Sequence, residues 1–572
     1  MSRIIGIDVG GTNTNAALLE EGRLVNTAQC PTNHQNLLDS TRTVLEEILQ
    51  ANSQSKPKDL SLHLSTTLTT NAVAEGRGEP AAAIVSPGPG VSLADMEFPF
   101  PVYPVNGSID HRGRETAPLE LDQVRQAMGT IAEKGFRTLA IIGKFAVRNP
   151  QHELAMEKLA RAEFPDITQV SLGHRLSGRL NFPRRVTTAL LNAGIAHIQS
   201  DFAGMIRKLA HDYGIDDQVS LLKADGGTMS LEESQVRPIE TVLSGPAASI
   251  MGALALGDFG HQTTVTLDIG GTTTEISVLV EGEPLGERDG AIIAGYRTLV
   301  PSLLTRSFGL GGDSRVYWSE RKLQIGPERE GPPFCLGGPV LTPTDAVVAL
   351  GETSFGDRKK ALEGLEGLGK EAGLNPLGLA EKIIGEFCDK ALHGIGEVLD
   401  YLNRIPVYTV SEVLAPRDLK PAKIIGMGGP AGYFIPKIAA KVGLDYQVLP
   451  YAEAANAIGA AASRPTAAIH LRADTALGKV VIPELDEIME IGGSMLFDRK
   501  QARALALEKA ALYAEKTGAC PGCPDIEITD EEVFNVVRGF HTTGRIYSLT
   551  AQVRPGVFPV QVGAGRKKGS SK

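Results

Sequence analysis

Apolar side chains occupy every second position in two stretches that lie far apart in the chain. Residues 5–9 and residues 265–269 both follow this pattern, with glycine, threonine or aspartate between the apolar positions. A period of two is typical of a β-strand that buries one face. The pattern therefore predicts two strands, in which Asp8 and Asp268 lie on the face opposite the apolar side chains.

Both predicted strands lead into turns of nearly the same composition. The two turn sequences are Asp8-Val9-Gly10-Gly11-Thr12-Asn13-Thr14 and Asp268-Ile269-Gly270-Gly271-Thr272-Thr273-Thr274. Paired glycines after an apolar strand are typical of a tight strand-to-strand turn.

Other stretches alternate between helical and strand-like spacing. Apolar residues at helical spacing predict helices in residues 37–50, 121–135 and 152–164, and short apolar runs predict strands in residues 138–147 and 167–172. Strands that alternate with helices indicate an α/β protein with a mostly parallel sheet.

A third glycine turn lies in residues 422–449, where we expect a strand, a turn at Gly428 and Gly429, and then a helix. The helix carries its apolar face at Ile435, Ile438, Ala439 and Val442, and Gly443 is placed to end it.

From about Leu471 the pattern changes, and residues 533–557 predict a hairpin-rich region. We therefore expect an N-terminal half in residues 1–185, a second half in residues 186–470 and a small α+β domain in residues 471–572. The sequence assigns no role to this last domain.

Charge and cysteine content limit the class of protein. The chain has 57 basic and 67 acidic residues, a net charge of −10, which argues against a nucleic acid or an anionic membrane as the main partner. Five thinly spread cysteines are typical of a reducing compartment. With no apolar run of about 18 residues and no signal-peptide pattern, a cytoplasmic location is expected.

The composition of the two turns favours phosphate binding. Backbone amides of a glycine turn can approach a phosphate closely, because no side chain intervenes, and threonine hydroxyls add donors. Magnesium prefers oxygen ligands and keeps several waters, so one or two carboxylates that face the phosphates are enough to hold it. We therefore expect Asp8 and Asp268, as hairpin-edge carboxylates that face solvent, to hold magnesium beside a nucleotide triphosphate.

This arrangement resembles the superfamily of acetate and sugar kinases, Hsp70 chaperones and actin. The resemblance implies two related α/β halves that close over ATP, with the two hairpins around its phosphates. In that superfamily the later glycine pair lies near the adenosine, which carries over to Gly428 and Gly429. Residues 244–246, Ser-Gly-Pro, lack the spacing of a nucleophile turn, so Gly245 is expected near the nucleotide.

A narrower resemblance comes from four segments between and around the hairpins. They are LSTTLTTNAVAEGRG, FAVRNPQHE, SLGHRLSGRLNFPRRVTTALLNA and LLKADGGTMSLEESQVRPIETVLSGPAAS. These segments are similar to patterns of the hydantoinase A and 5-oxoprolinase family, and the matches run in order from Ile4 to about Ala462.

The chain also departs from the family patterns. Leu64 and Ser65 stand where the family has His-Gly, Glu275 stands where aspartate often follows the second hairpin, and Asp225 replaces an asparagine. The lost histidine puts the substrate chemistry in doubt.

The family resemblance implies ATP-dependent opening of a cyclic amide or imide, together with a subunit of the hydantoinase B type. Transfer of the γ-phosphoryl group to a carbonyl oxygen would activate a poorly reactive substrate, and this chemistry mainly requires positioning and charge stabilisation. Asp225 or Glu275 would order the attacking oxygen. ATP-dependent carboxylation of a ketone is the other chemistry that the family hosts, and the sequence leaves open whether the chain forms a homo-oligomer.

Two other classes of function are weaker alternatives. A redox ATPase that activates a radical or corrinoid enzyme would use Cys520 and Cys523 in an iron–sulfur cluster shared between two subunits, but a plain turn is the simpler interpretation of this pair. A sugar kinase would need a polar hexose-binding loop that we do not find. His152 and His174 lie in the matched segments, where we interpret them as buried polar groups rather than metal ligands.

Overall fold

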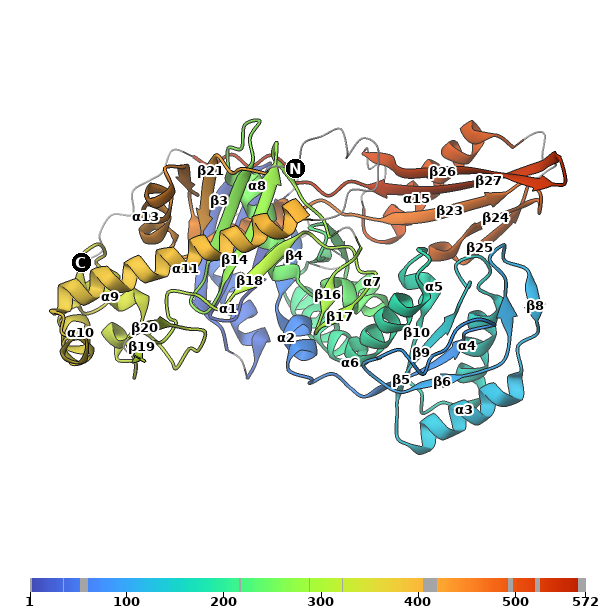
Figure 1. Ribbon diagram of the computed structural model, residues 1–572, viewed down its shortest axis with the longest axis horizontal. Coiled ribbons are helices and arrows are strands. Elements are labelled where there is room, and N and C mark those ends of the chain that lie inside the picture. Colours follow the sequence, from blue (N-terminus) through green and yellow to red (C-terminus); the bar gives the residue numbers. More distant parts are fainter. Residues whose placement is uncertain are drawn as a thin grey trace.

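The computed structural model describes residues 3–33, 35–51, 60–215, 218–287, 289–320, 322–404, 419–491, 497–519 and 525–563. Two main sheets stand on either side of two central helices, and a smaller parallel sheet and a C-terminal antiparallel sheet lie to one side of them (Figure 1). The α/β class that the sequence predicts is confirmed. The two main sheets are mixed, however, because each begins with an antiparallel hairpin.

The first main sheet has the order β12-β11-β4-β1-β2-β3. Its strands are β1 (Arg3–Val9), β2 (Asn13–Glu20), β3 (Arg23–Pro31), β4 (Leu60–Thr66), β11 (Val219–Leu222) and β12 (Thr228–Ser230). The apolar face of β1, with Ile5 and Ile7, packs against α1 (Leu37–Ala51) and the second half of the long helix α6 (Phe182–Asp212). The predicted helix at residues 37–50 and the predicted burial of this strand face are confirmed.

The second main sheet repeats the order of the first. It runs β15-β14-β13-β21-β22, with β18 also paired to β14. Its strands are β13 (Thr264–Ile269), β14 (Thr274–Val280), β15 (Glu283–Pro284), β18 (Thr305–Phe308), β21 (Lys423–Met427) and β22 (Asp445–Val448). In both sheets the hairpin is followed by two parallel strands, so the halves share one topology.

Helices α11 (Pro376–Arg404) and α13 (Ala431–Val442) cover the outer face of the second sheet. As predicted, Ile435 and Ile438 are buried and Gly443 ends α13 in the left-handed conformation. The prediction was wrong for Val442, which is 46% exposed, because the helix ends there and turns away from the sheet.

Two helices lie between the main sheets. Helix α14 (Ala455–Ala462) packs on β1 of the first sheet, and α8 (Ser244–Leu256) packs on α14 and contacts strands of both sheets. The helices cross at Gly252 and Gly459: a Cβ on Gly459 would lie 2.4 Å from the amide nitrogen of Gly252. Only glycines permit this approach, which brings the two sheets close together.

The smaller parallel sheet is inserted into the first half. It consists of β5 (Ala81–Ser86), β6 (Val102–Pro104), β9 (Thr138–Gly143) and β10 (Gln169–Leu172). Helices α3 (Leu121–Glu133) and α4 (Gln151–Glu163) cover one face, and the first half of α6 covers the other. The strand predicted over residues 138–147 is shorter, since β9 ends at Gly143 and residues 144–148 form a turn.

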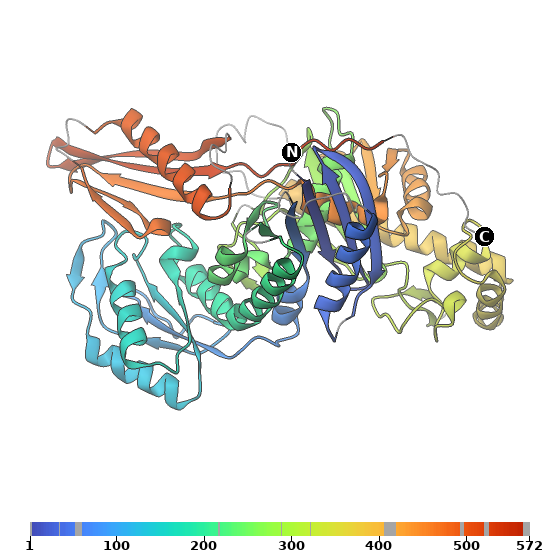
Figure 2. The same ribbon diagram turned by 180° about the vertical axis from the view of Figure 1, so that it is seen from behind.

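The C-terminal sheet has the order β25-β24-β23-β27-β26 with helix α15 (Arg499–Lys516) on one face (Figure 2). Its strands are β23 (Ala468–Asp474), β24 (Lys479–Ile482), β25 (Glu487–Glu490), β26 (Ile526–Arg538) and β27 (His541–Val553). This agrees with the predicted hairpin-rich region. The three-part division of the chain at residues 185 and 470 stays a prediction; the first main sheet itself takes β11 and β12 from beyond residue 185.

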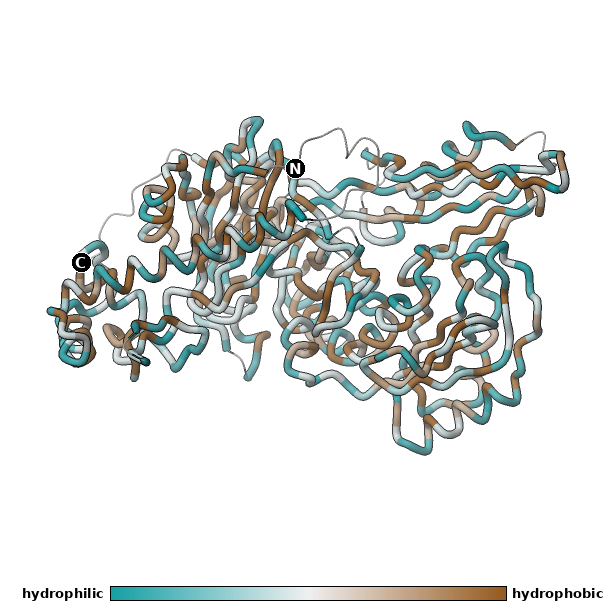
Figure 3. Tube along the Cα trace, viewed as in Figure 1, coloured by the Kyte–Doolittle hydropathy of each residue, from teal (hydrophilic) through white to brown (hydrophobic). Residues whose placement is uncertain are grey.

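Short elements connect these layers. They are α2 (Leu68–Ala74), β7 (Ser108–Ile109), β8 (Glu115–Ala117), α5 (Gly173–Leu176), α7 (Leu231–Val236), β16 (Ile292–Ile293), β17 (Tyr296–Arg297), β19 (Val316–Ser319), β20 (Lys322–Ile325), α9 (Pro343–Ala349) and α10 (Arg358–Ala372). Apolar residues gather within the layers in Figure 3. Across the described ranges, no helix combines the length and apolar character that a membrane crossing requires.

Candidate active site

The two predicted glycine turns face each other where the main sheets meet. Each is closed by the same backbone hydrogen bond, from Gly10 to Asn13 at 3.1 Å and from Gly270 to Thr273 at 2.9 Å. A Cβ on Gly271 would lie 3.4 Å from Oγ1 of Thr12, so the tips of the turns nearly touch. The structure therefore brings the two predicted phosphate turns to one place.

Asp8 and Asp268 lie at the ends of the two central strands, just before these turns. Asp8 is only 4% exposed, so the expectation of a carboxylate facing solvent was wrong for this residue. It is buried because the second half of the molecule and α14 close over the end of β1. Within the described chain, its Oδ1 atom is buried without a hydrogen-bond partner.

Both carboxyls have a raised pKa. Burial raises the pKa of Asp8 to about 7, and the charge of Asp268 adds to this effect while Ser65 and Asn456 oppose it. Burial also raises the pKa of Asp268, against the side chains of Ser249 and Asn456. Both carboxyls therefore retain a proton more readily than exposed aspartates do, and a nearby cation would release it.

Two residues that support Asp268 were missed by the sequence reasoning. Oγ of Ser249 on α8 donates to Oδ2 of Asp268 at 2.5 Å, and Nδ2 of Asn456 on α14 donates to the same oxygen at 3.2 Å. Ser65, which the sequence analysis named, is paired with Asp8 in the parallel register of β1 and β4 and adds a hydroxyl beside this carboxyl. Ser249 precedes Asp268 in the chain and Asn456 follows it, and no local pattern links either residue to the hairpin. Only the crossing of α8 and α14 reveals their position.

Glu275, the third predicted acidic residue, lies next to this pair. It is opposite Asp268 in the β13–β14 hairpin, and burial and the charge of Asp268 raise its pKa to about 7. Its Oε2 atom has no hydrogen-bond partner among the described residues. Asn15 takes the equivalent position opposite Asp8 in the first hairpin. The predicted role of Glu275 in ordering an attacking oxygen stays a prediction.

Gly245 lies in the first turn of α8, close to the end of β4. Leu243, which precedes the helix, is in the left-handed conformation with φ of 68°, and Oγ of Ser244 donates to the carbonyl of Thr66 at 3.0 Å. A Cβ on Gly245 would lie 3.7 Å from Thr67. The start of α8 is thereby held against the strand adjacent to β1, where its backbone amides can face an anion.

The third glycine turn also meets the carboxyls. Gly428 has φ of +87°, and a Cβ there would lie 2.8 Å from Oδ1 of Asp268 and 2.2 Å from the carbonyl of Ile269. Gly429 follows it and precedes α13. The turn lies between Asp268 and the outer helices of the second half, and its contact with adenosine stays a prediction.

A loop that the sequence reasoning missed supports the second hairpin. The amides of Gly312 and Asp313 donate to the carbonyls of Gly270 and Gly271 at 2.9 and 2.7 Å. Asp313 forms an ion pair with Arg329 at 3.2 Å, and Nη1 of Arg329 donates to Thr12 at 3.1 Å. The glycine pair before Asp313 was a usable sequence signal, whereas Arg329 had none.

Asp225 lies apart from the hairpins. Its carboxylate accepts hydrogen bonds from the amide of Gly227 at 2.9 Å, from Thr466 at 2.9 Å and from Lys223 at 3.1 Å. It borders a cavity of about 90 Å³, which the C-terminal sheet helps to line through residues such as Glu484. These contacts stabilise the turn after β11, and the predicted role of Asp225 beside the attacking oxygen finds no support in them.

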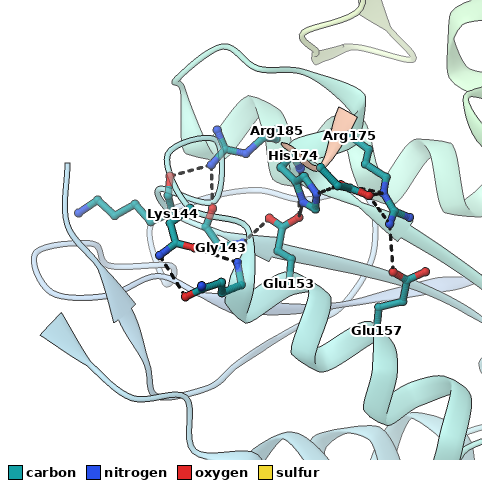
Figure 4. A network of polar contacts seen from close by, with 10 residues as sticks. Gly143, Lys144, Glu153, Glu157, His174, Arg175 and Arg185 are labelled. Atoms are coloured by element: carbon teal, nitrogen blue, oxygen red, sulfur yellow. Dashed lines mark hydrogen bonds and ion pairs between the residues drawn. The ribbon is translucent and has the colours of Figure 1, made fainter. Parts of the chain in front are cut away.

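His174 is held in a buried ionic network (Figure 4). Its Nδ1 atom lies 2.5 Å from Glu153 and its Nε2 atom 2.6 Å from Asp486 of the C-terminal region. Burial alone would lower the pKa of His174, but the two carboxylates outweigh it and raise the pKa to about 8. His152 likewise lies 2.8 Å from Glu115. Both histidines have carboxylate partners, as expected for structural polar groups.

The donor set at the hairpins fits a magnesium ion. The described residues contain no cluster of three or more histidine, cysteine, aspartate or glutamate side chains suited to a metal. Magnesium bound to a nucleotide needs only one or two carboxylates, because phosphates and water supply the remaining oxygens. Asp8 and Asp268 meet this requirement. Cys520 and Cys523, the predicted alternative metal pair, lie outside the described residues.

Sequence comparisons match most of the chain to one family. Residues 4–164 match the hydantoinase/oxoprolinase N-terminal region, and residues 185–469 match hydantoinase/oxoprolinase. The alpha subunit of caprolactamase from Pseudomonas jessenii is 26% identical over 483 residues, 78% of this chain and 68% of the relative. The gamma subunit of acetophenone carboxylase from Aromatoleum aromaticum is 25% identical, over 62% of this chain and 54% of the relative. 5-Oxoprolinase 1 from Arabidopsis thaliana is 25% identical, over 56% of this chain and 29% of the relative.

Solved structures show the same fold. The ATP-dependent caprolactamase from Pseudomonas jessenii aligns with a TM-score of 0.72 and 20% identity, over 99% of this chain and 90% of that one. A nucleotide-free acetone carboxylase aligns with a TM-score of 0.70 and 16% identity, over 98% and 88% of the two chains.

Proposed function

The chain belongs to the hydantoinase/oxoprolinase family, and we propose that it is an ATP-dependent enzyme subunit that phosphorylates the carbonyl oxygen of a cyclic amide or imide and so drives opening of the ring. The observation that carries the proposal is the meeting of two glycine hairpins between two halves of one topology, with a buried aspartate at the base of the first and a half-buried aspartate at the base of the second. Relatives named caprolactamase and 5-oxoprolinase support the substrate class.

The chemistry follows from the weak reactivity of an amide. The carbonyl oxygen attacks the γ-phosphorus of ATP, the bond to the bridging oxygen breaks, and ADP leaves. Water then adds to the activated carbon and loses a proton, and the C–N bond breaks as the nitrogen takes a proton. A second water hydrolyses the resulting acyl phosphate to a carboxylate and inorganic phosphate. In this proposal the two hairpins orient the phosphates and the start of α8 faces them with backbone amides. Magnesium, held by Asp8 and Asp268, would neutralise charge on the phosphates.

A second subunit fits this function. The names of two relatives describe them as subunits, alpha of caprolactamase and gamma of acetophenone carboxylase. We infer that this chain also works with another subunit, of the hydantoinase B type, in which the activated substrate reacts further. The thin spread of cysteines is the basis for proposing a cytoplasmic location.

Ketone carboxylation is the second candidate. The acetophenone carboxylase relative favours it, because a ketone enol can receive the same phosphoryl group before it reacts with carbon dioxide. Its match covers less of both chains than the caprolactamase match does. We therefore place it after amide hydrolysis.

Substrate-stimulated ATPase activity tests the proposal. Phosphate release is measured with hydantoins, lactams, 5-oxoproline and ketones, with and without the product of a neighbouring reading frame. Stimulation by a cyclic amide, together with ring-opened product in the complete assembly, is the expected result. ATPase activity that only ketones stimulate, with bicarbonate present, would favour ketone carboxylation. If neither the folded chain nor the assembly binds MgATP, both amide hydrolysis and ketone carboxylation are excluded.

A further inference from the structure

The side chain of Arg329 lies between the two hairpins, and the function proposed above gives it no role. Arg329 follows β20 in the second half of the molecule, yet its Nη1 atom donates to Oγ1 of Thr12 in the first hairpin at 3.1 Å. Its Nη2 atom lies 3.2 Å from Oδ2 of Asp313, on the loop that supports the second hairpin. The guanidinium therefore bridges the first turn and the loop that supports the second, near the place where the tips of the turns approach.

The guanidinium has a donor to spare. A guanidinium carries five N–H donors in a rigid fork. The Nε atom of Arg329 is buried and has no hydrogen-bond partner within the described part of the chain. A buried donor without an acceptor is uncommon in folded proteins and indicates that an acceptor belongs to a different state of the site.

The residues around Arg329 indicate that this acceptor is an anion. Arg329 sits against Thr12, in the turn whose amides and hydroxyls suit a phosphate, and Asp313 fixes its orientation. A planar guanidinium pairs with phosphate oxygens through two parallel hydrogen bonds, which a compact ammonium does not reproduce. We propose that Arg329 binds the terminal phosphates of the nucleotide and that Asp313 holds it in place for this. The inference rests on the function proposed above.

A merely structural role makes a different prediction. If Arg329 only held the two halves together, its loss would weaken the binding of every nucleotide that requires the closed arrangement. The affinity for AMP would then fall as much as the affinity for ATP. If Arg329 instead binds the terminal phosphates, its loss affects the three nucleotides differently. The affinity for ATP falls most, the affinity for ADP falls less, and the affinity for AMP hardly changes.

Calorimetric titration separates the two roles. ATP and ADP with magnesium, and AMP, are titrated into the full chain, as wild type and as Arg329→Gln. Loss of a charge-assisted hydrogen bond is expected to weaken ATP binding about 10- to 100-fold. We expect AMP affinity to stay within about twofold, because AMP lacks the phosphates concerned. Arg329→Lys keeps the charge but not the planar fork of donors. Its affinity for ATP should lie between those of the wild type and Arg329→Gln.

The matched control is Arg315→Gln. Arg315 lies nearby, but its side chain pairs with Glu330 at 2.6 Å and with Glu328 at 3.7 Å. This variant should bind all three nucleotides like the wild type. Should Arg329→Gln fail to fold, the ratio of ATP to AMP affinity in Arg329→Lys decides the question.

Three results would count against parts of the argument. Equal weakening of ATP and AMP would assign Arg329 to a clasp and overturn the inference. Unchanged ATP affinity in Arg329→Gln would overturn it while leaving the proposed function intact. A folded wild-type chain that binds none of the nucleotides would remove the inference together with the function on which it rests.

Discussion

One buried and two half-buried carboxyls define the site at the scale of single residues. Asp8, Asp268 and Glu275 lie close enough for the charge of Asp268 to raise the pKa of the other two. Burial favours the protonated form of all three carboxyls, and the charge of Asp268 adds to this for the other two, whereas a dication requires the ionised forms. Binding of a magnesium nucleotide should therefore release protons, and the protein's stability at this site should depend on pH.

Asp8→Asn and Asp268→Asn should each reduce ATP turnover at least about 100-fold, since even indirect metal partners commonly cost 10- to 100-fold. Loss of a metal ligand, and not unfolding, is the expected cause. Turnover and circular dichroism are measured together. Asp122→Asn is the control, because this exposed aspartate pairs with Arg125 on the outside of α3. Wild-type turnover in both site variants would rule out the metal site.

The raised pKa of Asp8 gives a signed prediction for stability. Between its ordinary value of 3.8 and about 7, the native protein holds a proton that the unfolded chain has released. The free energy of unfolding should therefore fall as pH rises through this window. We expect the melting temperature of metal-free protein to drop between pH 5 and pH 7.5, and to drop less in Asp8→Asn. An equal drop in both would show that Asp8 does not titrate in this range.

At the scale of elements, the site depends on how two helices cross. Helix α14 carries Asn456 and α8 carries Ser249, and both side chains reach Asp268 because the helices touch at Gly252 and Gly459. Each helix also contacts a main sheet. A change in the spacing of the two helices would therefore shift the two halves relative to each other. It would also displace the side chains that donate hydrogen bonds to Asp268.

Gly459→Ala tests this coupling. The new Cβ would lie 2.3 Å from the carbonyl oxygen of Ala248, so the helices must separate, at a cost of about 1–3 kcal/mol. We expect a lower unfolding free energy in urea and a lower ATP turnover. Gly396→Ala in α11 meets no atom within 4 Å and should instead stabilise by about 0.5–1 kcal/mol. Equal behaviour of the two variants would contradict the importance of the crossing.

At the scale of the whole molecule, ion pairs join the inserted sheet to the C-terminal sheet. His174 and Arg175 both contact Asp486, and Arg112 forms a two-pronged contact with Asp474. The C-terminal sheet also helps to line the cavity at Asp225. The last sheet is thereby fixed to the body of the protein through buried and half-buried charges.

His174→Gln should loosen this junction. Breaking a buried ion pair commonly costs about 3–5 kcal/mol, because the partner charge stays buried. Hydrogen exchange is expected to rise in β23 and β24 and around α5, but not in the main sheets. Exposed His393→Gln is the control. Because the pKa of His174 is raised to about 8, its contribution is present below about pH 6.5 and lost as pH rises through 8. No change in exchange would show that other contacts hold the junction.

Much of the fold was predictable because its signals are local. Alternation placed β1 and β13, helical spacing placed α1, α3 and α4, and the repeated Asp-x-Gly-Gly turns indicated that two hairpins meet. Each of these features depends on a few neighbouring residues. The backbone geometry of strands, helices and glycine turns gives each of them a characteristic residue pattern that can be recognised in the sequence. Val442 was misplaced because a helix end does not follow the periodicity of its interior.

The sequence by itself thus determined the elements, the α/β class and the residues of both hairpins. Only the tertiary structure decided which distant side chains complete the site. Ser249, Asn456 and Arg329 lie outside the hairpins, on two helices and a loop, and their positions follow from the packing of α8 on α14 and from the loop after β20. Burial of Asp8 and the separate place of Asp225 arise in the same way. Contacts between distant segments depend on the packing of whole layers, which no short stretch of residues encodes.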